Sequence, residues 1–108
     1  MLIAIDYDGT WTRAPEFFRA MVLKGARYGL SFVMVTGRSD SGRWGREVRD
    51  NVGDLMPIVF ADNGWKKAAA LRAGYEVDVW IDDKPEGIDR LETAAIAKRD
   101  ADTQEAAK

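Results

Sequence analysis

The sequence predicts an α/β domain built around a central parallel sheet. Four short apolar runs alternate along the chain with longer amphipathic stretches, which is the order of repeated strand–helix–strand units. The apolar runs are nearly continuous, as is typical of strands buried on both faces of a parallel sheet. Polar clusters follow these runs, and in parallel sheets the carboxyl ends of the strands form the usual binding edge.

The predicted strands are residues 2–5, 32–35, 57–61 and 77–81. A polar connection spans 6–14, and Pro15 suits the first turn of a helix that Gly29 stops. Three further helices are predicted over residues 41–52, 65–73 and 86–98. An alanine-rich tail or helix extension occupies 93–108.

Length and composition narrow the possible chemistry. The 108 residues suffice for one domain, which we expect to span 1–108. The net charge of −2 gives no overall field that would attract nucleic acid or a membrane. The absence of Cys and His excludes thiolate chemistry and the commonest zinc ligand, so carboxylates and lysines remain, a set that suits Mg²⁺. No apolar stretch resembles a targeting or membrane segment, so we expect a cytoplasmic protein.

The segment Asp6-Tyr7-Asp8-Gly9-Thr10 is the most informative stretch. Two carboxylates one residue apart at a strand end point in similar directions, because side chains alternate with period two. A metal ion or a shared proton would relieve their repulsion. The plain alternative is an ordinary acidic turn at Asp8-Gly9.

Two more segments could contact a phosphate group. Thr36, Gly37 and Arg38 offer a hydroxyl and backbone N–H groups where a strand turns into a helix. Lys66 and Lys67 follow the third strand and could place an ammonium beside a phosphate or a carboxylate. Each segment alone is also compatible with an ordinary turn or a solvated helix face.

Asp82 and Asp83 end the fourth strand, and adjacent acids at such a place repel one another. A bound Mg²⁺ would resolve this repulsion. Together the polar clusters form a set for phosphoryl transfer, with one carboxylate to attack phosphorus, another for proton transfer, and cations to stabilise the charged oxygens.

These motifs, in this order, resemble those of the haloacid dehalogenase (HAD) superfamily of hydrolases over residues 2–90. The resemblance implies a three-layer sandwich with a Rossmann-like core. It also implies that Asp6 is the nucleophile that forms an aspartyl-phosphate and that Asp8 is the general acid and base. The backbone carbonyl of Asp8 would be a Mg²⁺ ligand. The expected activity is a Mg²⁺-dependent phosphatase acting on phosphate monoesters.

Further roles follow from the same resemblance. Thr36 would bind the transferring phosphoryl group, with Gly37 and Arg38 beside it. Asp83 would bind the metal directly, and Asp82 directly or through water.

The family motif has one lysine, and this chain has two at that place. Relatives often carry a leucine four residues after it. Lys67 with Leu71 fits that spacing, so Lys67 is preferred over Lys66.

Relatives that act on small metabolites usually carry a cap domain. Here the segments between Thr10 and Thr36 and between Arg38 and Lys67 are too short for one. We therefore expect an open site, unless the short flap at 11–14 or a second copy of the chain covers it. Water exclusion would then be weak.

Aromatic and basic residues near the motifs hint at the substrate. Trp11, Trp44 and Trp65 could stack on a base or sugar, although core packing is the simpler reading of each. Arg43, Arg46 and Arg49 could form a basic stripe or merely a solvated face. Jointly they favour a nucleotide or a phosphorylated nucleic-acid end as substrate.

Three other functions fit the same residues. A phosphotransferase would pass the phosphoryl group to an alcohol, and a non-catalytic module would bind phosphate and keep the motifs. A signalling receiver domain also uses Asp, Mg²⁺, Thr and Lys. The receiver is disfavoured because its adjacent acid pair follows the first strand, whereas here that pair comes last.

Overall fold

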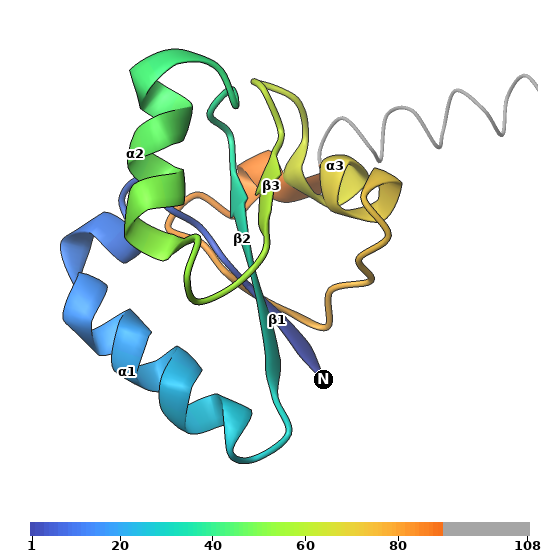
Figure 1. Ribbon diagram of the computed structural model, residues 1–108. Helices are drawn as coiled ribbons and strands as arrows, with labels where there is room; N and C mark the ends of the chain where they lie inside the picture. The colour runs from blue at the N-terminus through green and yellow to red at the C-terminus, as the bar shows by residue number, and fades with distance from the viewer. Residues whose placement is uncertain (90–108) are drawn as a thin grey trace, which may run out of the picture.

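The computed structural model describes residues 1–89 and confirms an α/β fold with a parallel sheet (Figure 1). The strands are β1 (Leu2–Ile5), β2 (Ser31–Thr36), β3 (Ile58–Phe60) and β4 (Val79–Ile81). The helices are η1 (Trp11–Arg13, one 3₁₀ turn), α1 (Pro15–Ala26), α2 (Gly42–Val52) and α3 (Lys66–Arg72). Residues 86–89 are helical, and the rest of the helix predicted to 98, like the tail at 93–108, lies outside the described residues.

The sheet has the order β3-β2-β1-β4, and every pairing in it is parallel. Strand β1 is therefore central, and β4 pairs with it in the register Ile5↔Ile81. Since β1 begins at Leu2, residues before Val79 have little strand left to pair with. This explains why β4 is shorter than predicted.

Side chains of the central strands alternate between two hydrophobic clusters. Along β2, Phe32 and Met34 belong to one cluster, and Val33 and Val35 belong to the other. The first cluster includes residues of α1 and α2, and the second includes residues of α3. In Figure 1, α1 and α2 accordingly lie on one side of the sheet and α3 on the other. Burial on both faces is the physical reason for the continuous apolar runs in the sequence.

Helix α1 begins at Pro15 as predicted and ends at Ala26, before the turn at Gly29. Its close packing on the sheet depends on Gly25, because a Cβ there would lie 2.6 Å from the ring of Phe32. The polar connection predicted at 6–14 contains η1, whose Trp11 is buried. Among residues 1–89, no helix is long and apolar enough to cross a membrane.

Candidate functional site

Three carboxylates meet where β1 and β4 end. The Asp6 N–H donates to the carbonyl oxygen of Ile81 at 2.9 Å, so the ends of the two strands are tied together. Asp6 follows β1, and Asp82 and Asp83 follow β4. Each of the three offers a carboxylate oxygen, and these oxygens all lie within 4.8 Å of one another. The structure therefore brings together the acidic residues that the sequence predicted for a metal site.

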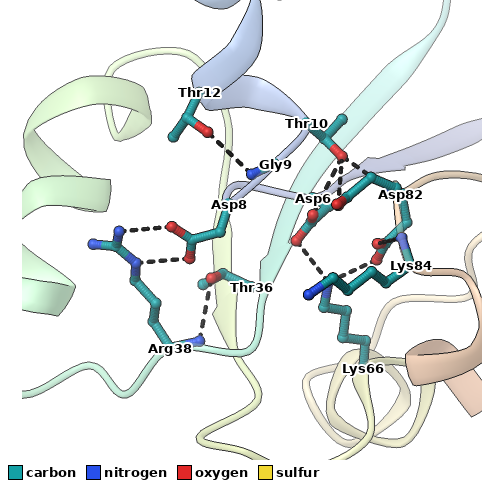
Figure 2. A network of polar contacts seen from close by, with 11 residues as sticks. Asp6, Asp8, Gly9, Thr10, Thr12, Thr36, Arg38, Lys66, Asp82 and Lys84 are labelled. Atoms are coloured by element: carbon teal, nitrogen blue, oxygen red, sulfur yellow. Dashed lines mark hydrogen bonds and ion pairs between the residues drawn. The ribbon is translucent and has the colours of Figure 1, made fainter.

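Lys66, the first residue of α3, neutralises part of this charge (Figure 2). Its Nζ donates to Asp6 Oδ1 and to Asp82 Oδ2, both at 2.6 Å. The side chains of Lys66, Asp6 and Asp82 are only 13%, 6% and 1% exposed. A pair of buried carboxylates with one buried ammonium is a strongly coupled arrangement, unlike a surface ion pair.

The preference for Lys67 is revised, because Lys67 is exposed and Lys66 occupies the site. Helix α3 packs on the sheet through Ala69 and Ala70, which share a face with Lys66 at i+3 and i+4. Leu71, whose spacing had favoured Lys67, is 43% exposed. The helix is therefore turned so that its alanines, and not its leucine, face the core.

Thr10 joins the turn after β1 to Asp83. Its hydroxyl accepts a hydrogen bond from the Asp83 N–H at 3.1 Å. The same hydroxyl lies 3.2 Å from a carboxylate oxygen of Asp6 and 3.2 Å from one of Asp83, and it can donate its single proton to either of them. Gly9 has a φ of +80°, and a Cβ on it would overlap the Asp83 carboxylate. Sequence analysis did not single out Thr10 as a site residue, although its place at the end of the acidic motif was a usable signal.

Asp8 turns away from the other acids and pairs with Arg38 (Figure 2). Arg38 Nε donates to Asp8 Oδ2 at 2.8 Å and Nη2 donates to Asp8 Oδ1 at 2.7 Å. The Asp8 side chain is 57% exposed, and the Arg38 side chain is 11% exposed. The prediction that the backbone carbonyl of Asp8 binds a metal stays a prediction.

Tyr7 anchors the turn that carries both aspartates. It is 2% exposed and belongs to the cluster under α1 and α2. Its hydroxyl accepts a hydrogen bond from Asn51 Nδ2 at 2.8 Å. Because Tyr7 points into the core, Asp6 and Asp8 on either side of it are directed to the cleft.

The cleft at this edge of the sheet has a volume of about 450 Å³. Its lining residues are Asp6, Asp8, Gly9, Gly37, Arg38, Asn63, Gly64, Lys66, Asp82, Asp83 and Lys84. Thr36 does not line it, because its side chain is fully buried and its hydroxyl accepts the Arg38 N–H at 3.2 Å. The predicted contact between Thr36 and a phosphoryl group therefore needs a local movement, whereas Gly37 is already in place.

Burial controls ionisation at Asp6. Loss of solvent raises the pKa of Asp6 to about 6, and the hydrogen bond and charge of Lys66 oppose only part of that rise. Burial lowers the pKa of Lys66, but its hydrogen bonds to Asp6 and Asp82 outweigh burial, so the pKa is raised overall. The pKa of Asp83 is lowered, first by its hydrogen bond with the Asp6 carboxyl group.

The surrounding aromatic and basic residues separate into different environments. Trp11 is 3% exposed, so it is a core residue. Trp65 is partly buried, and its Nε1 has no hydrogen-bond partner among residues 1–89. Trp44 is 62% exposed and lies over the guanidinium of Arg38.

The predicted basic stripe on α2 is divided. Arg43 and Arg46 line an open groove together with Trp44. Arg49 pairs instead with Asp40 and lies over the ring of Phe60. Only the first two arginines therefore remain available beside the exposed indole.

Comparisons of the chain with protein-family models, with curated proteins and with solved structures find no match. The functional argument therefore depends on the residues and the geometry of the cleft.

Proposed function

We propose that this chain is a Mg²⁺-dependent phosphatase of the HAD type, with the three-layer core of that superfamily. It would hydrolyse phosphate monoesters through an aspartyl-phosphate on Asp6. One observation carries the proposal: the carboxylates of Asp6, Asp82 and Asp83 converge at the carboxyl ends of adjacent parallel strands, with Lys66 among them.

The donor set fits Mg²⁺. All the convergent ligand atoms are carboxylate oxygens, which hard cations prefer, and Mg²⁺ commonly uses one or two carboxylates together with waters and substrate phosphate. Three carboxylates with one buried lysine leave an excess of negative charge that a divalent cation would balance. Asp6, Asp83 and the backbone carbonyl of Asp8 would hold the ion, with Asp82 binding directly or through water. The ion would supply neutralisation of charge on the phosphate oxygens.

The chain's own residues account for the two chemical steps. Asp6 attacks phosphorus, the bond to the ester oxygen breaks, and Asp8, which enters this step protonated, donates its proton to the departing oxygen. Asp8 then removes a proton from water, and the water oxygen attacks phosphorus. Inorganic phosphate leaves, and the Asp6 carboxylate is restored. Lys66 and the Gly37 N–H would stabilise negative charge on the transferring group.

The cleft would accept substrates larger than simple metabolites. The segment at 11–14 cannot serve as a flap in this conformation, because Trp11 is anchored in the core and η1 is packed beside α1. Cover from a second copy of the chain remains part of the proposal. The open cleft also favours an alternative, a phosphotransferase, because it would admit an alcohol as readily as water. A product assay with added glycerol separates the two reactions.

A nucleotide or a phosphorylated nucleic-acid end is the substrate class we propose. Trp44 is an exposed indole that lies over the guanidinium of Arg38, and Arg38 contacts Asp8. Arg43 and Arg46 line the same groove as Trp44, together with the acidic residues Glu47 and Asp50. An exposed aromatic ring with adjacent cations suits a base and a second phosphate.

The test is hydrolysis of p-nitrophenyl phosphate by wild type, Asp6→Asn and the matched control Asp89→Asn. Asp89 is exposed and lines neither the cleft nor the groove beside Trp44. We expect activity that requires Mg²⁺, is lost in Asp6→Asn and is retained in the control. Equal activity in wild type and Asp6→Asn would refute the mechanism. A chain that binds Mg²⁺ and phosphate but turns over no ester in a panel of nucleotides and 5′- or 3′-phosphorylated oligonucleotides would instead be a binding module.

A further inference from the structure

Arg38 was expected to bind phosphate, but its guanidinium is already committed. Two of its N–H groups hold the two oxygens of Asp8, at 2.8 and 2.7 Å. Its Nη1 donates to the carbonyl oxygen of Trp44 at 3.0 Å and lies 3.1 Å from Glu47 Oε2. Of the five N–H donors of a guanidinium, these contacts leave one.

Two aromatic rings also lie against the same guanidinium. Its central carbon lies 5.0 Å from the centre of the Tyr7 ring and 4.7 Å from that of Trp44. Tyr7 is buried in the core, so it is a fixed partner. With these contacts and an exposure of only 11%, the Arg38 side chain has little freedom to move toward a substrate.

The consequence falls on Asp8. Its side chain is 57% exposed and would otherwise rotate freely at the mouth of the cleft. A two-point contact with a rigid partner fixes both of its oxygens, since fork-to-fork pairing sets orientation as well as distance. The same contact keeps Asp8 apart from the group that Lys66 holds, so in this structure Asp6 and Asp8 contact different cations.

We propose that Arg38 is a positioning residue, which orients Asp8 for proton transfer to the leaving group and is not a ligand of the substrate phosphate. This inference rests on the proposed phosphatase function. Fixing a proton donor in its working geometry removes a reorganisation step from the reaction. Replacing Arg38 should therefore slow only those reactions that depend on proton transfer by Asp8.

The test compares leaving groups. Departure of 2,4-dinitrophenolate needs little protonation, whereas departure of an alkoxide such as glycerol needs a general acid. We expect Arg38→Gln to lower the single-turnover rate of glycerol release from glycerol phosphate by roughly 100-fold, within the usual range for general acid catalysis. For 2,4-dinitrophenyl phosphate the single-turnover rate of dinitrophenolate release, which precedes the action of Asp8 on water, should fall by less than about threefold. KM should change little for either ester.

A double-mutant cycle gives a second readout. Adding Arg38→Gln to Asp8→Asn should cause no further loss, because Arg38 would act through a group already removed. Equal losses for both esters, a raised KM, or an additive loss in the double variant would make Arg38 a phosphate ligand and overturn the inference. Activity that is indifferent to Asp6→Asn would instead overturn the proposed function, so the two failures are distinguishable.

Two variants guard against a folding artefact. Arg38→Lys keeps the charge and much of the length but can contact only one Asp8 oxygen, so it should show the same dependence on leaving group at smaller size. Arg27→Gln, at an exposed position after α1, is the matched control and should leave both reactions unchanged. Thermal melts of all variants establish that the compared proteins are folded, and a uniform loss in a folded Arg38→Lys would refute the positioning role by itself.

Discussion

Replacing Lys66 by Met should destabilise the metal-free protein far more than the same change at Lys67. Lys66 Nζ bridges Asp6 and Asp82 at 2.6 Å each, and the three side chains are at most 13% exposed. Removing one partner of such a buried group leaves uncompensated charge and costs about 3–5 kcal/mol. Lys67 is exposed, and its replacement should change stability by no more than about 0.5 kcal/mol.

The assay is urea denaturation with a chelator at pH 7.5, with Arg19→Met as an internal scale for surface pairs. Arg19 and Asp54 are 41% and 66% exposed, so that variant should lose only about 0.2–1 kcal/mol. Mg²⁺ should restore part of the stability of Lys66→Met, since a cation would replace the missing ammonium charge. Equal effects at Lys66 and Lys67, or a loss below about 1 kcal/mol at Lys66, would refute the reasoning.

Three further predictions concern the turn, the metal and the substrate. Gly9→Ala should lower the stability and the Mg²⁺ affinity more than Gly29→Ala does. Both glycines have φ near +80°, but only at Gly9 would the new Cβ meet Asp83. Calorimetry of the two variants measures both effects. Burial raises the pKa of Asp6 to about 6, so the folded apo-protein binds an extra proton between the ordinary pKa and that value. The free energy of unfolding of the apo-protein should therefore fall as pH rises through this window. Over the same window Mg²⁺ binding should tighten and release protons, which titration calorimetry in two buffers detects. Binding without proton release would contradict this prediction. Trp44→Ala should raise KM for nucleotides by about tenfold, the loss of one stacked base, and leave KM for p-nitrophenyl phosphate unchanged; equal changes would remove Trp44 from recognition.

The strands and the acidic cluster could be predicted because they depend on simple regularities. Continuous apolar runs mark strands covered on both faces, and parallel strands bring their carboxyl ends to one edge, so Asp6, Asp82 and Asp83 had to approach one another. The ends of the strands differ from the prediction where a neighbouring strand stops. Strand β4, for example, begins at Val79 instead of residue 77. Core packing was the simpler reading of Trp11, and its burial agrees with it. The sequence also left open a flap at 11–14, because the burial of Trp11 depends on the packing of α1 and α2.

The position of Lys66 in the cleft and the contacts of Arg38 depend on geometry that hydrophobic periodicity does not contain. The buried face of helix α3 contains Ala69 and Ala70. Alanine is less hydrophobic than leucine, so the sequence pattern pointed to the face of Leu71 instead. The pairing of Arg38 with Asp8 depends on side-chain rotamers and on the direction of two turns far apart in sequence. Sequence analysis could place these residues near the cleft, but it could not assign their partners.

The order of the strands has a consequence for how the molecule is made. Strand β1, which precedes Asp6, is the first of the four strands to leave the ribosome. Strand β4, which precedes Asp82 and Asp83 and pairs with β1 alone, is the last. A nascent chain with only β1 to β3 could pair three strands and pack α1 and α2, yet it would lack two of the three carboxylates that meet at this edge. Under the proposed function, cation binding would therefore follow completion of the sheet, and chelation during synthesis should leave earlier steps of folding unaffected.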